Sequence, residues 1–247
     1  MTKMVNWNNW NQLEKLTEEF HKKLGKEEYG SMVTKCGITS GMSIENTLDS
    51  NKCCSPNMFI DIGANIGAAS FYLASIYPDI NIHAIEANPY IYEWLCRNIK
   101  VNNMEKRITP HFLAIAGVEG EVTFNCARLQ GNVGVGRIDR VHENIRYKEK
   151  VKSVKLDTFF EDNNIKHVDA IKCDIEGAEF EVFSHFTKWD SVLAYHIEVH
   201  DSFDMGFEFV CDKIKKDENY KENFINYIRE RVTSPNKRLT PGYLKCR

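Results

Sequence analysis

The sequence lacks the features of a membrane-spanning or exported protein. No apolar stretch approaches the roughly 20 residues that a transmembrane helix needs. The first thirty residues alternate charged side chains with single aromatic ones and contain no apolar core of a signal peptide. We therefore expect no membrane span and a cytoplasmic, intracellular location.

The cysteines lack the spacing of a metal or redox motif. The chain has 8 of them, with no Cys-x-x-Cys pair and no Cys/His quartet at zinc spacing. Cys96, Cys173 and Cys211 lie within patterns typical of helix or strand interiors, where cysteine is usually a small buried apolar residue. We expect free thiols in a reducing compartment.

The sequence also lacks a strong charge of either sign. With 32 basic and 35 acidic residues, the formal net charge is −3. This balance opposes nucleic-acid binding through bulk charge, so we do not expect a nucleic-acid partner. One local basic cluster exists, diluted by Asp139, Glu143 and Glu149; it consists of Arg128, Arg137, Arg140, Arg146, Lys148 and Lys150.

What is present is typical of a globular protein with one large domain. The chain has 247 residues, of which 43% are hydrophobic and 27% charged. Residues 1–50 are interpreted as an N-terminal helical arm and linker, because residues 1–30 have helical periodicity and 36–57 are rich in Gly, Ser, Asn and Pro. Residues 51–247 form the predicted main domain. The oligomeric state stays open.

Apolar strands alternate with amphipathic helices along the main domain. Strands are predicted at 58–62, 81–86, 109–116, 168–174 and 191–200, and helices at 66–74, 89–101, 157–161, 178–186 and from 201 to about 232. Residues 121–124 either extend the sheet or start a hairpin, 127–150 look irregular, and 238–245 are a candidate last strand. This alternation predicts an α/β fold, with a mostly parallel sheet and helices on both faces.

Parallel sheets of this kind bind ligands beyond the carboxyl ends of their strands. The residues at these ends are mostly acidic: Asp61, Glu86, Asp174, Glu176, His200 and Asp201. Several carboxylates in one crevice favour a cationic ligand and repel a pyrophosphate. The strand ends therefore predict a site for a positively charged cofactor.

The turn after the first strand supports the same prediction. Its pattern from Asp61 to Gly67 is Asp-x-Gly-x-x-x-Gly, with a carboxylate where a dinucleotide fingerprint has its first glycine. A carboxylate there suits S-adenosylmethionine, which carries a sulfonium and an ammonium and no phosphate. We expect Gly63 to let the backbone approach the ligand and Gly67 to pack a helix on a strand. A turn that only reverses the chain is the alternative.

Glu86 lies 19 residues after Gly67, a spacing typical of the acidic residue that binds the two ribose hydroxyls. A solvated charge at a strand end is the alternative for Glu86. The predicted cofactor-binding residues are Asp61, Gly63, Ala64, Asn65, Gly67, Glu86, Ala87, Asn88, Asp174 and Glu176.

Two further strand-end residues are the candidates for catalysis. Asp174 ends a buried run, where an unpaired carboxylate is costly, and His200 can take a proton near neutral pH. Glu179 would lie in the first turn of a helix, where a structural role explains its charge. A divalent metal, Mg²⁺ or Mn²⁺, is an alternative way to activate a hydroxyl, with Asp174, His200 and Asp201 as possible ligands. The sequence assigns no metal site.

Three segments resemble the FkbM family of methyltransferases: FIDIGANIG (59–67), AIEANP (84–89) and VDAIKCDIEGAE (168–179). The resemblance spans about residues 57–201 and also includes 154–157 and 197–200. It implies a Rossmann-like class I methyltransferase fold and methyl transfer from S-adenosylmethionine to a hydroxyl of a small molecule, with a sugar or glycan as the acceptor. The family resemblance has no counterpart for the first 50 residues, and the class usually ends in an antiparallel strand pair.

Two other kinds of function compete with this interpretation. A methyltransferase acting on another small molecule, on nucleic acid or on protein would share the scaffold. A non-catalytic cofactor-binding module would share it too. Asp61, Glu86 and Asp174 argue against this alternative, because a degenerate site has no electrostatic need for these carboxylates.

Overall fold

The computed structural model describes residues 37, 39–46, 48–49, 55–126, 137–138, 147–198, 226 and 238–239. The predicted N-terminal periodic helix and the candidate base His200 lie outside these residues, as does the helical stretch predicted after residue 200 except for residue 226, which is helical. Within them, no helix is long and apolar enough to cross a membrane.

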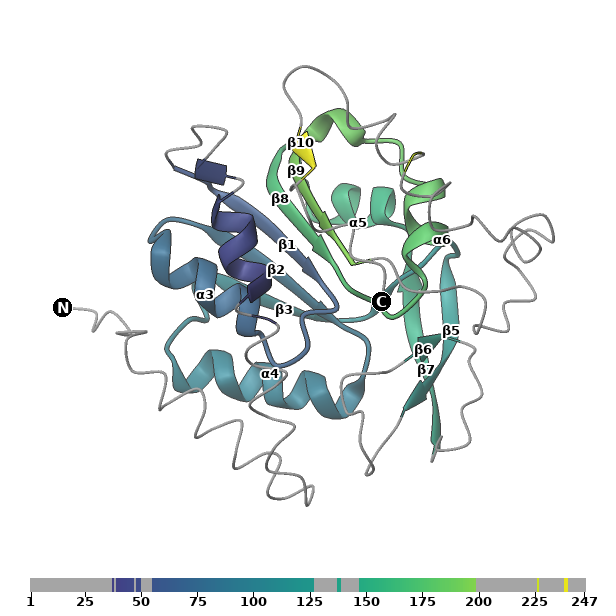
Figure 1. Cartoon of the computed structure of the whole chain (residues 1–247). Coiled ribbons are helices and arrows are strands. Elements are labelled where there is room, and N and C mark those ends of the chain that lie inside the picture. Colours follow the sequence, from purple (N-terminus) through teal and green to yellow (C-terminus); the bar gives the residue numbers. More distant parts are fainter. Residues whose placement is uncertain are drawn as a thin grey trace.

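The core of the molecule is a parallel sheet of six strands in the order β10-β9-β8-β1-β2-β3 (Figure 1). The strands are β1 (Met58–Ile62), β2 (Asn81–Glu86), β3 (Ile108–Phe112), β8 (Val168–Cys173), β9 (Val192–Ile197) and β10 (Arg238–Leu239). Every neighbouring pair in this sheet is parallel. The predicted α/β fold with a parallel sheet is confirmed.

Helices cover both faces of this sheet: α3 (Ala68–Ile76), α4 (Pro89–Val101), α5 (Leu156–Asp162) and α6 (Glu179–Ser184), with a short turn η1 (Trp189–Ser191) before β9. One core cluster packs Phe71 of α3 and Leu95 of α4 against Phe59 of β1. The other packs Phe160 of α5 and Phe183 of α6 against the opposite face. Since successive strand residues point to opposite faces, β1 contributes to both clusters.

A second, smaller sheet was predicted only in part. It has the order β4-β7-β5-β6, from β4 (Ala114–Ile115), β5 (Gly120–Cys126), β6 (Arg137–Ile138) and β7 (Tyr147–Val154). The single strand predicted at 109–116 is therefore wrong, because β3 and β4 belong to different sheets. The hairpin alternative for 121–124 is close to the observed antiparallel pairing of β5 with β7. The irregular structure predicted for 127–150 is wrong at 137–138 and 147–150.

The predicted loop at 36–57 is also wrong in part, because residues 39–46 and 48–49 are helical. Ile44 and Leu48 are buried in the core cluster that includes α3. A Cβ on Gly41 would lie 2.7 Å from the ring of Tyr72, a residue of α3. The Tyr72 hydroxyl donates a 2.6 Å hydrogen bond to Glu45. Glycine here lets two helical segments approach closely. In the sequence alone, the same glycine was one of the residues that indicated a linker.

We expect Gly41→Val to destabilise the protein by about 1–3 kcal/mol, because the new methyl groups overlap the fixed Tyr72 side chain. Denaturant unfolding measures this change. Met42→Ala is the matched control in the same segment: its side chain is 48% exposed, so the free energy of unfolding should change by less than about 0.5 kcal/mol. An equally stable Gly41→Val variant would contradict the close packing.

Candidate functional site

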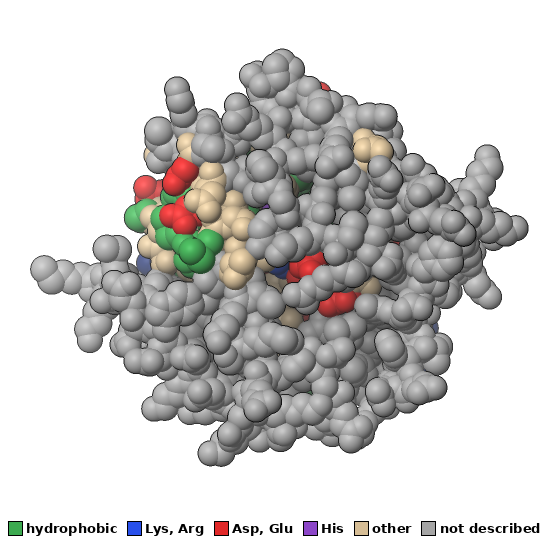
Figure 2. Space-filling model, in the orientation of Figure 1, with side chains coloured by type: hydrophobic (Ala, Val, Ile, Leu, Met, Phe, Trp, Pro, Cys, Tyr) green, Lys and Arg blue, Asp and Glu red, His purple; other side chains and the backbone are tan. Residues whose placement is uncertain are grey.

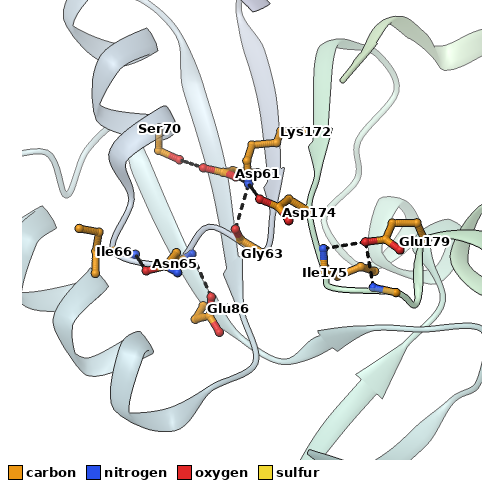
Figure 3. Close-up of polar contacts among 11 residues, drawn as sticks. Asp61, Gly63, Asn65, Ile66, Ser70, Glu86, Lys172, Asp174, Ile175 and Glu179 are labelled. Atoms are coloured by element: carbon orange, nitrogen blue, oxygen red, sulfur yellow. Dashed lines mark hydrogen bonds and ion pairs between the residues drawn. The ribbon is translucent and has the colours of Figure 1, made fainter. Parts of the chain in front are cut away.

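A buried ion pair lies at the carboxyl end of the sheet (Figure 3). Asp61 of β1 and Lys172 of β8 are partners in the strand register, and the Lys172 Nζ is 3.3 Å from the Asp61 Oδ1. The Ser70 hydroxyl of α3 donates a 2.7 Å hydrogen bond to the Asp61 Oδ2. Asp61 is wholly buried and Lys172 nearly so. The carboxylate predicted to face the ligand is therefore engaged by protein groups on the α3 side of the sheet.

The ammonium of Lys172 contacts two further segments. It donates a 3.0 Å hydrogen bond to the carbonyl oxygen of Gly63 and lies 3.9 Å from the Asp174 Oδ2. Burial disfavours the charge, but the carboxylates of Asp61 and Asp174 outweigh it and hold the pKa of Lys172 above its usual value. Lys172 is thus a buried cation surrounded by three acceptors.

The glycine turn is shaped by backbone packing. Gly63 has a φ of 74°, and a Cβ there would collide with the carbonyl oxygen of Asp174, so no other residue fits. The amides of Gly63 and Ala64 both donate to the Ile85 carbonyl of β2. Ala64 itself is buried in the core. The close approach that the structure shows at Gly63 is to the end of β8.

Gly67 precedes α3 with a φ of 93°. A Cβ there would lie 2.8 Å from both Leu95 of α4 and Phe71 of α3. The expectation that Gly67 packs a helix on a strand is wrong, since its close neighbours belong to two helices.

Glu86 joins the glycine turn to the start of α4. Its Oε2 accepts a 2.9 Å hydrogen bond from the Asn65 amide, and its Oε1 accepts a 2.7 Å bond from the Asn88 amide. Burial raises the pKa of Glu86 to about 7, although these amides and the charge of Lys172 oppose the shift. Asn65 has a φ of 54°, in the left-handed region. Glu86 is 7% exposed and is therefore no solvated strand-end charge.

Two other predicted cofactor-binding residues have structural contacts. The Asn88 side chain caps α4 by accepting from the amides of Tyr90 and Ile91, and Pro89 is the first residue of the helix, as predicted. Ala87 is partly buried against the core of the second sheet.

The segment after β8 presents one carboxylate and buries another. The Asp174 side chain is 31% exposed, and Glu176 follows in the left-handed region at a φ of 58°. Glu179 is almost fully buried, and its Oε1 accepts from the amides of Ile175 and Gly177 at 3.2 and 3.0 Å. Glu179 therefore braces the loop that carries Asp174, as its predicted structural role requires.

Sequence reasoning missed two charged or titratable residues of this region. Lys172 is one, and His196 of β9, its register partner on the other side, is the second. Burial lowers the pKa of His196 to about 3, and the nearby charge of Lys172 adds to the shift, so His196 is neutral. A lysine within the apolar run of 168–174 was the available signal, because a buried ammonium needs anionic partners.

Figure 2 shows Asp and Glu side chains near the middle of the face and a second group of them at its upper left. Across the described part of the chain, no group of three or more His, Cys, Asp or Glu side chains is arranged to hold a metal ion. Two of the three metal ligands suggested by the sequence, His200 and Asp201, lie outside that part.

Comparison with known proteins assigns the chain to a family. Residues 61–228 match the model of the methyltransferase FkbM domain, which is more than half of the chain. The chain belongs to the FkbM methyltransferase family. The resemblance predicted from 59–67, 84–89 and 168–179 is thus confirmed.

The relatives are distant. Methyltransferase sdnD of Sordaria araneosa is 26% identical over 152 residues, covering 50% of this chain and 58% of its own length. Methyltransferase 1 of Beauveria bassiana is 23% identical over 164 residues, covering 59% of this chain and 66% of its own length. The match thus spans less than two thirds of either relative. Among solved structures, a precorrin-6y C5,15-methyltransferase from Geobacter metallireducens is 13% identical with a TM-score of 0.37, covering 69% of this chain and 63% of its own.

We expect Glu179→Ala to lower the free energy of unfolding by about 2–4 kcal/mol, because two amides of the loop lose a charged acceptor. Denaturant unfolding would measure the loss. Glu93→Ala, on the exposed face of α4, is the control and should change stability by less than about 0.5 kcal/mol. A Glu179→Ala variant as stable as the control would show that the loop does not depend on this carboxylate.

Proposed function

We propose that this methyltransferase transfers the methyl group to a hydroxyl oxygen, with a sugar or glycan as the acceptor. The observation that carries the proposal is the partly exposed carboxylate of Asp174, anchored by Lys172 directly beside the glycine turn. A carboxylate at this position can accept a hydrogen bond or a proton from an acceptor hydroxyl. The choice of a sugar rests on the family resemblance of the segments 59–67, 84–89 and 168–179.

The residues present fit a cationic, ribose-containing cofactor. The Glu86 carboxylate accepts the backbone amides of Asn65 and Asn88, and a ribose hydroxyl could donate a further hydrogen bond to it. The charge of Asp61 is already matched by Lys172, so the carboxylates that attract a cation are Glu86, Asp174 and Glu176. Asp61, Gly63, Ala64, Gly67 and Asn88 then act by shaping the turn, with Asn65 and Ala87 beside the ligand.

S-adenosylmethionine supplies a methyl group already activated by its sulfonium. The protein's own task is to orient the acceptor and to take up its proton. We assign the proton to Asp174 or to His200, which ends the fifth strand predicted from the sequence. A metal-assisted variant would use Asp174, His200 and Asp201. Loss of activity on chelation, restored by Mg²⁺ or Mn²⁺, would favour that variant.

We expect the affinity for S-adenosylhomocysteine to rise with pH through about 7. The carboxylate form of Glu86 accepts hydrogen bonds from the ribose hydroxyls. Because its pKa is raised to about 7, Glu86 is protonated at lower pH and must lose this proton when the ligand binds. Affinity should fall by up to about tenfold per pH unit below 7 and level off above about pH 8. Isothermal titration calorimetry between pH 5 and 9 measures the profile.

Glu86→Gln is the control for this profile. It should bind at least about tenfold more weakly at pH 8, because charge-assisted bonds are lost, and its affinity should not vary with pH between 5 and 8. A flat wild-type profile, or an unchanged slope in Glu86→Gln, would contradict the assignment of Glu86.

The acceptor is tested by methyl transfer from labelled S-adenosylmethionine to matched panels of glycans, other small hydroxyl compounds, RNA and protein. We expect label in the glycan panel, with the new bond at oxygen identified by mass spectrometry. Asp174→Asn and His200→Asn should each be compared with wild type, and the variant that loses about a hundredfold in turnover identifies the base. Label only in RNA or protein would overturn the proposed acceptor, and no transfer with intact cofactor binding would favour a non-catalytic module.

A further inference from the structure

Lys172 makes more contacts than the neutralisation of Asp61 requires. Its ammonium reaches acceptors on three separate segments: Asp61 within β1, the carbonyl of Gly63 in the glycine turn, and Asp174 beyond β8. The contact with Gly63 is a hydrogen bond of 3.0 Å, and those with Asp61 and Asp174 are ion pairs of 3.3 and 3.9 Å. Figure 3 shows Lys172 between Asp61, Gly63 and Asp174.

The segments that Lys172 joins also meet through their backbones. The Asp174 amide donates a 3.1 Å hydrogen bond to the carbonyl of Ile62, and Gly63 packs against the Asp174 carbonyl so closely that a Cβ is excluded. The turn and the end of β8 are therefore in contact through their backbones as well as through Lys172. The hydrogen bond from Lys172 to Gly63 is charge-assisted, and such a bond is stronger than one between neutral groups.

Lys172 has two register partners on the neighbouring strands, Asp61 of β1 and His196 of β9, and only Asp61 is an acid. His196, on the opposite side from Asp61, is neutral because burial depresses its pKa. The acceptors that contact the Lys172 ammonium therefore lie on β1, in the glycine turn and at Asp174, and the neutral His196 of β9 adds no charge to them.

We infer that Lys172 is a positioning residue of the methyl-transfer site, which holds the glycine turn and the Asp174 carboxylate at a fixed separation. The inference rests on the proposed placement of the cofactor at this turn. Lys172 acts through Gly63 and Asp174 and is not expected to touch the reacting atoms. Its removal should therefore displace the cofactor side of the site even when the buried charge of Asp61 is removed with it.

A double-mutant cycle separates this role from charge neutralisation. Lys172→Met alone leaves Asp61 buried without its cation and should lower the denaturant midpoint strongly. Asp61→Asn combined with Lys172→Met removes both charges, so the midpoint should recover toward that of Asp61→Asn. The affinity for S-adenosylhomocysteine should nevertheless stay at least about tenfold below that of Asp61→Asn. Equal affinities of Asp61→Asn and the double variant would overturn the inference.

The control is Lys188→Met, which removes another lysine from an ion pair, here the exposed 2.9 Å pair with Glu161, and should leave both midpoint and affinity unchanged. A second measurement needs no variant. In wild-type protein with ¹⁵N-labelled lysine, the buried Lys172 ammonium should give a slowly exchanging signal that shifts when S-adenosylhomocysteine binds. A signal that does not move would overturn the inference.

These readouts use S-adenosylhomocysteine alone and need no acceptor. Failure to methylate any hydroxyl would contradict the proposed function and leave the role of Lys172 intact. Conversely, a wild-type-like double variant would remove the role of Lys172 and leave the proposed acceptor untouched.

Discussion

The pairing of Asp61 with Lys172 is the constraint on which the rest of the site depends. Two charges buried at the carboxyl end of the sheet are tolerated only together, because either one alone would lose its hydration without compensation. The pairing requires β1 and β8 to be neighbours in register. That register in turn places the glycine turn against Asp174 and leaves Glu86 on the other side of the turn. The arrangement of the site thus follows from which strands are adjacent.

Local sequence predicted the elements whose signals are local. The strand 81–86 and the helix 89–101 have their predicted bounds, since an apolar run, a capping Asn88 and Pro89 at the first helical position act within a few residues. The helical residues 39–46 were missed because the meaning of Gly41 depends on Tyr72, thirty-one positions along the chain. β7 was missed because its sequence, YKEKVKSV, contains consecutive charged residues and has no long apolar run, while its strand partners β4 and β5 lie more than 20 residues earlier in the chain.

The sequence predicted where the residues of the candidate site lie better than it predicted what each of them contacts. The acidic residues expected at the strand ends are there where the structure describes them, and Asp61 contacts Lys172 and Ser70. A one-dimensional pattern cannot tell which carboxylate a lysine on another strand neutralises. Glu179 shows the opposite case, because its place in the first turn of α6 was enough to predict a structural role.

The glycine turn is held from both sides by opposite charges. Glu86 accepts a hydrogen bond from the amide of Asn65, and Lys172 donates one to the carbonyl of Gly63. An acidic side chain thus binds an N–H of the turn, and a basic side chain binds a carbonyl of the turn. Such a turn is ordered by the protein before any ligand arrives, and a ligand that binds it has less conformational entropy to overcome. Asn65 lies in the left-handed region, and the hydrogen bond of its amide to Glu86 helps to offset the backbone cost of that conformation. Since a methyl transfer depends on placing two reacting atoms in line, stiffness at this turn is what the fold has to provide.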